Sequence, residues 1–276
     1  MSDTPLIVPG AEPFFFPGAS PGDAPGGPVG CLLLHGFTAM PEEMRWLGEF
    51  LAGQGHTVLG VRLAGHATHP ADLARTRWTD WLISVEEGLA ILRGVTDQVY
   101  LIGQSMGGMI ALVAAARYPV DGVIAMSTPS DMGGKAPPRA VRLFFRLRPL
   151  IRKPTEPAAP PLAERREAEY PAYPLFPARI LQEVDLLRGA LYEALPQVRV
   201  PVLLIHSRAD ATVNADSMPR IHERLGSTDK QMLWLDGMDH SLVRDPQRQV
   251  VFDAVAAFVA GCASQTRGER MGHVDG

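Results

Sequence analysis

Residues 98–108 read Gln-Val-Tyr-Leu-Ile-Gly-Gln-Ser-Met-Gly-Gly, and this stretch decides the fold. An apolar run leads into Ser105, and small apolar residues over 106–117 predict a helix directly after it. The three glycines beside the serine leave room for a sharp strand-to-helix turn, which lifts a serine hydroxyl clear of a sheet. At the start of a helix, backbone N–H groups and the helix dipole face any developing negative charge. In this setting the pattern Gly-x-Ser-x-Gly predicts that Ser105 is a nucleophile.

Strand and helix patterns alternate outward from this turn. Apolar runs of strand length lie at 29–35, 57–63, 98–103, 121–127, 200–207 and 230–236, and helical patterns lie at 41–54, 78–93, 106–117, 215–225 and 246–259. Such alternation indicates an α/β protein with a mostly parallel, doubly wound sheet and helices on both faces.

Several segments interrupt this alternation. Residues 17–28 are rich in proline and glycine and predict a loop. Residues 130–196 contain a proline-rich stretch, and we expect them to form a cap (lid) inserted above the sheet. The core then consists of 1–129 and 197–262. The polar residues 263–276 are expected to form a disordered tail.

The composition narrows the class of protein. The chain has 276 residues, of which 46% are hydrophobic and 20% charged, enough for a large core. A net charge of −4 gives no indication of nucleic-acid binding. Two cysteines, Cys31 and Cys262, make no disulfide framework, and Cys31 is expected to be buried. The N-terminus lacks a signal-peptide pattern and no apolar run could span a membrane, so we expect a cytoplasmic protein.

A serine hydroxyl needs a neighbouring base, and that base needs an orienting carboxylate. In sheets of this architecture the two partners follow the serine in the order acid, then histidine. His240 lies between the last predicted strand and the last helix, so we expect it to be the base. Asp210 follows the strand at 200–207 and is the expected acid. Asp236 and Asp239 are alternatives, but their closeness to His240 in sequence favours a role in shaping its loop.

None of the other histidines is expected to be the base. His66 and His69 share one loop, but their spacing matches no zinc signature, so no metal is expected. His35 is expected to shape the turn beside the site, and His206 lies in or at the end of a predicted strand. The remaining histidines are expected on the surface or in the tail: His56, His222 and His273.

Two backbone N–H groups are predicted to bind the oxyanion that forms when the serine attacks a carbonyl. Met106 follows the nucleophile directly and supplies the first. Phe37 supplies the second, from the loop after the strand at 29–35, where Gly36 allows the chain to approach closely. The donor is a backbone group, so the Phe37 side chain can occupy a core position at the same time.

The chain resembles the bacterial monoacylglycerol lipases and related small carboxylesterases of the α/β-hydrolase superfamily. The similarity covers nearly the whole chain outside the cap and the tail. Its motifs are Gly10–Phe14, His35–Thr38, Arg62–His69, Asp80–Trp81, Ser84–Gly88 and Gln104–Gly108. Two features depart from the family: Gln104 stands where leucine is expected, and the cap is richer in proline and arginine.

This resemblance implies the α/β-hydrolase fold and a serine hydrolase that cleaves carboxylic esters through an acyl-enzyme, without a cofactor. Monoacylglycerols are the implied substrates, with an apolar acyl pocket under the cap. A broad carboxylesterase of short-chain or aryl esters, a thioesterase or a lactonase would use the same catalytic groups. A catalytically inactive binding protein is the alternative from another class. Related dehalogenases and epoxide hydrolases use an aspartate nucleophile, so Ser105 argues against both.

The resemblance also implies that a cap glutamate binds the glycerol hydroxyls. The spacing within Arg166–Tyr170 assigns this role to Glu167, with Glu164 and Glu169 as alternatives. A solvated charge cluster explains these residues equally well.

Residues 139–153 carry six basic and no acidic side chains, interleaved with apolar ones. Such a segment can make transient contact with an anionic lipid surface. It can also pack its apolar face over the pocket while its arginines stay in water, and this second interpretation is favoured.

Overall fold

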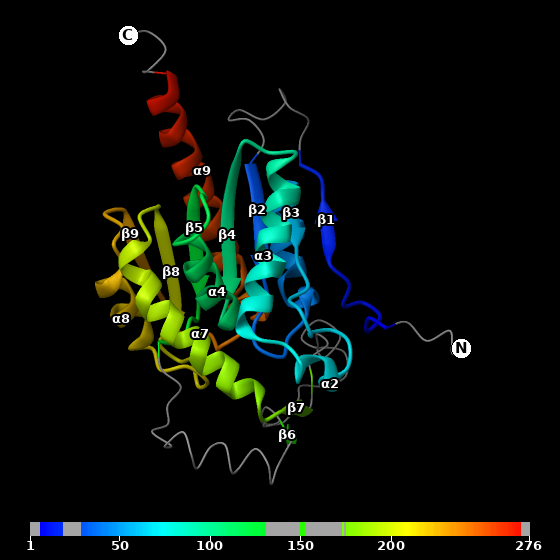
Figure 1. Ribbon diagram of the computed structural model, residues 1–276. Coiled ribbons are helices and arrows are strands. Elements are labelled where there is room, and N and C mark those ends of the chain that lie inside the picture. Colours follow the sequence, from blue (N-terminus) through cyan, green and yellow to red (C-terminus); the bar gives the residue numbers. More distant parts are fainter. Residues whose placement is uncertain (1–5, 19–28, 131–149, 153–172, 174, 272–276) are drawn as a thin grey trace.

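Seven strands form one sheet in the computed structural model, which describes residues 6–18, 29–130, 150–152, 173 and 175–271, with the backbone alone from 264 onward. The strand order is β1-β3-β2-β4-β5-β8-β9 (Figure 1). All neighbouring pairs are parallel except β1 with β3. The strands are β1 (Phe14–Phe16), β2 (Val29–Leu34), β3 (Thr57–Gly60), β4 (Gln98–Gln104), β5 (Gly122–Met126), β8 (Val202–Ser207) and β9 (Lys230–Leu235).

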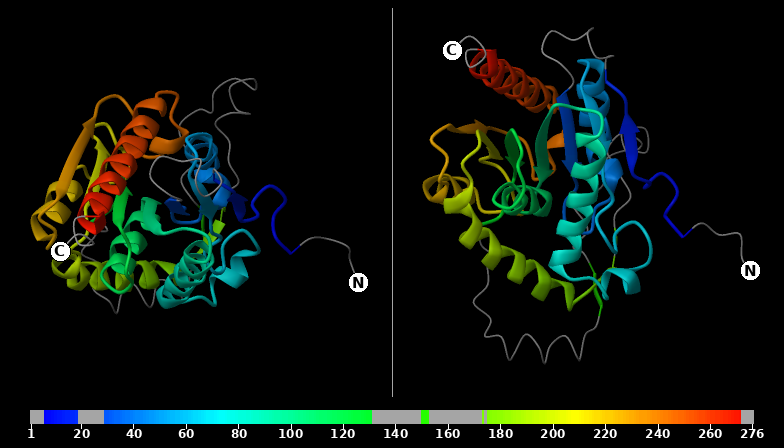
Figure 2. Two further views of the ribbon diagram at one scale, coloured as in Figure 1. Left: turned by 90° about the horizontal axis from the view of Figure 1, so that it is seen from above. Right: turned by 45° about the horizontal axis from the view of Figure 1, so that its top comes forward.

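Helices cover both faces of this sheet (Figure 2). One face packs against α1 (Arg45–Gly53) and α9 (Gln249–Met271). The other packs against α3 (Trp78–Arg93), α4 (Met106–Ala115), α7 (Ile180–Ala194) and α8 (Ser217–Arg224). The prediction of a mostly parallel, doubly wound sheet with helices on both faces is therefore confirmed.

The shorter elements lie in the connections. They are the 3₁₀ turns η1 (Pro41–Met44), η2 (Leu195–Gln197) and η3 (Leu242–Arg244), the one-turn helix α2 (Pro70–Leu73), and a separate antiparallel pair of β6 (Leu150–Arg152) with β7 (Leu175–Pro177). The helix predicted over 41–54 thus begins with a 3₁₀ turn.

The central strands are buried along their whole length, as strands covered on both faces must be. In β2, Leu32 and Leu34 belong to the hydrophobic cluster under α3 and α4. Their neighbours Cys31 and Leu33 belong to the cluster under α1 and α9. Alternate side chains therefore supply two cores, one on each face of the sheet. Both cysteines are buried and free, and burial raises the pKa of the Cys31 thiol to about 12.

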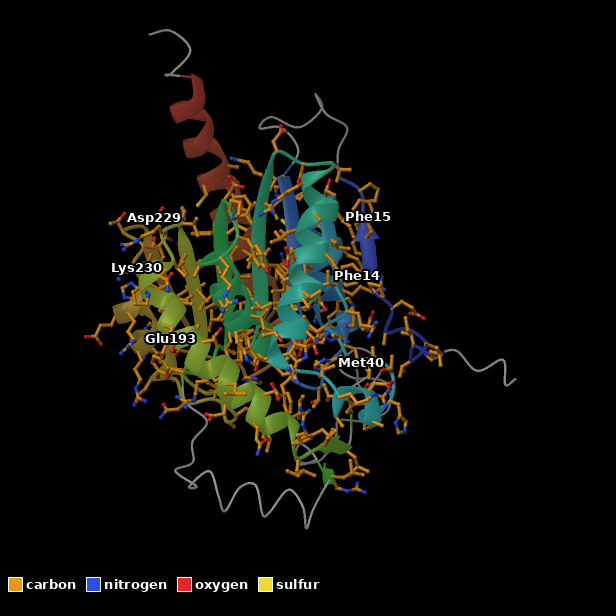
Figure 3. All side chains as sticks on the ribbon, in the orientation of Figure 1. Phe14, Phe15, Met40, Glu193, Asp229 and Lys230 are labelled. Carbon is orange, nitrogen blue, oxygen red and sulfur yellow. The ribbon has the colours of Figure 1, made fainter. Side chains whose placement is uncertain are left out.

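Strand β1 lies at the edge of the sheet and was not predicted. Phe14 and Phe15 on this strand point in opposite directions (Figure 3): Phe14 is buried, whereas Phe15 is 46% exposed. The Phe14 ring occupies space left by two glycines, because a Cβ atom on Gly60 would lie 2.2 Å from it and one on Gly48 would lie 2.7 Å away. The strand has only three residues, between Pro13 and Pro17, which is too short a stretch to show the alternation that predicts a strand.

The described residues of the expected cap include β6, β7 and α7. Helix α7 packs against α4, and its Leu187 and Leu191 are fully buried in the same core cluster. Other parts of the segment 130–196 lie outside the described residues, so its role as a cap remains a prediction. Among the described residues, no helix is long and apolar enough to cross a bilayer.

The C-terminal end differs from the expected tail. Helix α9 continues to Met271, although disorder was expected from residue 263. Residues 263–271 hold good helix formers and no proline, so an amphipathic helix that has already formed can extend through them. Residues 272–276 lie outside the described part of the chain.

Candidate active site

The predicted functional residues meet at one edge of the sheet. Ser105 follows β4, Asp210 follows β8 and His240 follows β9, while the loop from His35 to Thr38 follows β2. These four strands are parallel, so their carboxyl ends lie along the same edge. Open α/β sheets bind their ligands at that edge.

Ser105 occupies a strained turn between β4 and α4. Its φ is 56° and its ψ is −117°, a conformation that residues other than glycine rarely adopt. A Cβ atom on Gly103 would lie 2.2 Å from the Gly107 carbonyl oxygen, and one on Gly107 would lie 2.2 Å from the Leu34 carbonyl oxygen. Glycine is therefore required at both positions, as the sequence pattern predicts for a turn that holds a serine above a sheet.

A chain of hydrogen bonds links the three side chains. His240 Nε2 lies 3.0 Å from Ser105 Oγ, and His240 Nδ1 lies 2.8 Å from Asp210 Oδ2. The imidazole is 17% exposed, and the Asp210 carboxylate is fully buried. With Nδ1 donating to the carboxylate, Nε2 is free to accept the serine proton.

Asp210 is stabilised as a carboxylate. Burial opposes its ionisation, but contacts from His206 and His240 and a backbone N–H bond outweigh this and hold the pKa of the carboxyl well below its ordinary value. Its Oδ1 accepts hydrogen bonds of 2.8 Å from the N–H groups of Thr212 and Val213. The carboxylate is therefore ionised and fixed in orientation over the whole physiological pH range.

The two alternative acids have other partners. Asp239 accepts the backbone N–H of His240 through Oδ1 at 2.7 Å, which shapes the histidine loop. Asp236 is exposed and lies 3.6 Å from Arg208. Of the three aspartates, only Asp210 faces the His240 ring.

The loop after β2 lies against the nucleophile. A Cβ atom on Gly36 would lie 3.4 Å from the Ser105 Cβ. The Gly36 N–H donates to Oε2 of the buried Glu43 at 2.6 Å, and the Thr38 carbonyl accepts the Tyr173 N–H at 3.0 Å. Thr38 is fully buried with a φ of 58°, a strained conformation for a β-branched residue. Strain of this kind persists only where the surroundings hold it, and the contacts with Glu43 and Tyr173 hold this loop in place.

Of the two predicted oxyanion donors, Met106 directly follows Ser105, and Phe37 directly follows Gly36, which lies against Ser105. Met106 is the first residue of α4, so its N–H has no acceptor within the helix. Phe37 lies between Gly36 and Thr38, and no acceptor for its N–H occurs in the described part of the chain. Its ring packs edge-on against Phe176 at 5.1 Å between centroids.

Two further histidines are buried beside this loop. His35 Nδ1 lies 3.0 Å from the Gly36 carbonyl and its Nε2 accepts the Leu63 N–H at 3.2 Å, so the ring ties the loop to the neighbouring chain. His66 stacks edge-on against His35 at 5.0 Å. Burial lowers the pKa of His66 to about 4 and that of His35 well below its ordinary value, so both rings are neutral at pH 7. Within the described ranges, no cluster of side chains could hold a metal ion.

Three buried residues at the site were not assigned a role from the sequence. Glu43 anchors the Gly36 N–H, His206 lies 3.2 Å from Asp210, and Gln104 donates to the His240 carbonyl. Only Gln104 gave a signal in the sequence, as the departure from an expected leucine. Glu167 and its alternatives, Glu164 and Glu169, lie outside the described residues.

Comparisons with known proteins identify the family of the chain. The profile of a family described as serine aminopeptidase, S33, matches residues 30–247. The chain is 29% identical over 270 residues to a thermostable monoacylglycerol lipase from Bacillus sp. (strain H-257), across 94% of this chain and 98% of that protein. It is 26% identical over 235 residues to a carboxylesterase from Bacillus subtilis (strain 168), across 85% and 93% of the two chains.

Solved structures share the fold. One, described with the metagenome-derived lipolytic enzymes LipS and LipT, has a TM-score of 0.80 at 28% identity, over 92% of this chain and 99% of that chain. The monoacylglycerol lipase of Paleococcus ferrophilus has a TM-score of 0.72 at 20% identity, over 91% and 98%. The predicted similarity to small lipases and carboxylesterases is therefore confirmed.

Proposed function

Because the chain belongs to the α/β-hydrolase family described as serine aminopeptidase, S33, we propose that it hydrolyses carboxylic esters through an acyl-enzyme. In this proposal Ser105 is the nucleophile, His240 the general base and Asp210 the residue that orients His240. The observation that carries it is the continuous contact from Ser105 Oγ through both ring nitrogens of His240 to a buried carboxylate.

Acylation begins when Ser105 Oγ attacks the ester carbonyl carbon and its proton passes to His240 Nε2. The negative charge that develops on the carbonyl oxygen is bound by the N–H groups of Phe37 and Met106. The carbon–oxygen bond to the leaving alcohol then breaks, and His240 returns the proton to that alcohol. Asp210 stabilises the imidazolium between these two transfers.

Deacylation repeats the same steps with water. His240 takes a proton from water, whose oxygen attacks the acyl carbon, and the oxyanion forms again beside the same two donors. When the bond to Ser105 Oγ breaks, the proton returns to the serine and the carboxylic acid leaves. The chemistry needs no cofactor.

Monoacylglycerols are the proposed substrates, with the acyl chain in an apolar pocket under a cap formed by 130–196. This is supported by the lipase with which the chain shares 29% identity over nearly its full length. In the same proposal Glu167 binds the glycerol hydroxyls, and the enzyme acts in the cytoplasm with at most transient contact with lipid. The carboxylesterase relative supports a second candidate, a broad esterase of short-chain or aryl esters.

The test is hydrolysis by wild type and Ser105→Ala over a series of p-nitrophenyl esters, methyl esters and monoacylglycerols of matched acyl length. The proposal expects wild type to prefer medium or long monoacylglycerols over the methyl ester of the same acid, and Ser105→Ala to be inactive. Glu167→Gln should remove that preference, and its loss in Glu164→Gln or Glu169→Gln instead would move the role to that alternative.

Other results would change the proposal in defined ways. Cleavage of short activated esters alone would reject the glycerol recognition and favour the broad esterase. Cleavage of aminoacyl p-nitroanilides in place of esters would favour a peptidase, as the family description suggests. A folded wild type that hydrolyses none of these substrates would reject the enzyme assignment.

A further inference from the structure

The side chain of Gln104 connects the nucleophile strand to the histidine loop. Its Nε2 donates a hydrogen bond of 2.8 Å to the backbone carbonyl of His240, a residue 136 positions away in sequence. Gln104 is fully buried and directly precedes Ser105. We propose that Gln104 is a positioning residue, which holds the general base at a fixed place relative to the nucleophile. This inference rests on the proposed function and adds a group that acts through His240.

The backbone of His240 has three described hydrogen bonds, and two of them are local. Its N–H donates to the side chain of Asp239, and its carbonyl accepts the N–H of Leu242 at 3.0 Å. Asp239 belongs to the same loop and Leu242 begins the adjacent 3₁₀ turn η3, so neither bond reaches the central sheet. Among the described residues, Gln104 alone ties the backbone of His240 to the central sheet.

The hydrogen bond from Gln104 matters because the ring of His240 must contact two groups at once, Ser105 and Asp210. Its Nε2 must stay close to Ser105 Oγ, which follows β4, and its Nδ1 close to Asp210, which follows β8. Gln104 is the last residue of β4 and directly precedes Ser105, so its hydrogen bond sets the position of the His240 backbone relative to the nucleophile. A misplacement of about 1 Å at a reacting group can cost about a hundredfold in rate.

The other end of the Gln104 amide argues against a purely structural role. Its Oε1 is buried and has no hydrogen-bond partner among the described residues. A buried polar atom without a partner destabilises a folded protein, and an apolar side chain of the same size removes that cost. If packing alone decided this position, leucine would serve as well or better. A glutamine that supports His240 at some cost in stability is what a positioning role predicts.

The variant Gln104→Leu distinguishes a positioning role from a purely structural one, because leucine keeps the size and burial of the side chain. Gln98→Leu is a matched control, because Gln98 is also buried, lies at the opposite end of β4 and has an unpartnered Oε1. Three quantities are compared with wild type for both variants: kcat and KM on one ester, the free energy of unfolding, and hydrogen–deuterium exchange of the amides of residues 237–242.

A positioning role predicts that Gln104→Leu lowers kcat about tenfold while KM stays within about twofold. Its free energy of unfolding should equal or exceed that of wild type, and amide exchange in 237–242 should become faster. Gln98→Leu should change neither kcat nor exchange in that loop.

The proposal is overturned if Gln104→Leu matches wild type in both kcat and exchange, or if its activity falls only in proportion to a loss of folded protein. The exchange measurement needs no turnover. A wild type that cleaves no ester would therefore reject the proposed function. The exchange measurement would still test whether the hydrogen bond from Gln104 holds the histidine loop.

Discussion

His206 Nε2 lies 3.2 Å from Asp210 Oδ2 in the protein interior, where both side chains are at most 1% exposed. The same oxygen faces His240 at 2.8 Å, so one carboxylate oxygen lies between two imidazoles. The geometry at His206 falls short of a well-formed hydrogen bond, because Nε2 has no aligned partner. The contact nevertheless helps to keep the pKa of Asp210 low, which stabilises the charge that His240 requires.

Replacing His206 is expected to weaken the orientation of Asp210 without abolishing activity. His206→Leu removes one polar neighbour of the buried carboxylate but leaves the Thr212 and Val213 N–H groups in place. We expect kcat to fall about three- to tenfold, in line with the loss of one of several polar contacts to a buried carboxylate. His206→Gln keeps an N–H group near the Nε2 position and should retain more activity than the leucine variant. Equal kcat values for wild type and His206→Leu would contradict this role.

Glu43 is expected to support the oxyanion loop. Its buried carboxylate accepts the Gly36 N–H at 2.6 Å, one residue before the proposed donor Phe37. Glu43→Leu removes the acceptor, and we expect kcat to fall tenfold or more, since loss of one oxyanion donor costs about 100- to 1,000-fold. Glu43→Gln keeps an acceptor and should recover part of this rate, with little change in KM in either variant.

The control for Glu43 is Glu42→Gln, on the same 3₁₀ turn, where the carboxylate pairs with Arg45 instead. That variant should retain wild-type kcat. If Glu43→Leu has the same kcat as the control, the loop keeps its geometry without the anchor and the proposed role fails.

Stability should fall as the pH drops, because the fold keeps His66 neutral. Its pKa in the folded protein is about 4, lowered by burial, against an ordinary value of 6.5. Between these values the unfolded chain binds a proton that the folded protein does not, so the free energy of unfolding rises with pH. The slope is about 1.4 kcal/mol per pH unit for each such histidine, and it disappears below pH 4, where the folded protein binds the proton as well.

Urea unfolding of wild type and His66→Gln at several values between pH 7 and pH 4.5 measures this contribution. The variant should lose stability less steeply over that window, whatever its stability at pH 7. His222→Gln, on the outer helix α8, is the control. Parallel stability curves for wild type and His66→Gln would show that burial of this ring does not cause the pH dependence.

The sequence was sufficient for residues whose position follows from the topology. Ser105, Asp210 and His240 each follow a strand, and parallel strands bring such residues to one edge whatever the details of packing. The glycines beside Ser105 were equally predictable, because the sharp turn leaves no space for their Cβ atoms.

Supporting residues could not be predicted, because their roles depend on which distant side chain faces them. Gln104 was recognised as unusual, but its partner is 136 residues away and only the folded chain brings the two together. Glu43 reads in the sequence as a charged residue in the first turn of a helix, yet it is 3% exposed and faces inward. The edge strand β1 was missed for a related reason, since its pairing with β3 fixes it rather than its own pattern.

Detection of the acyl-enzyme tests the central claim most directly. Wild type and Ser105→Ala are mixed with a p-nitrophenyl ester, quenched in acid within the first turnovers, and analysed by intact and peptide mass spectrometry. The account predicts that wild type gains the mass of one acyl group on the peptide containing Ser105, and that Ser105→Ala gains none. Ester cleavage at the wild-type rate by Ser105→Ala, or an acyl group on any other residue during turnover, would contradict it.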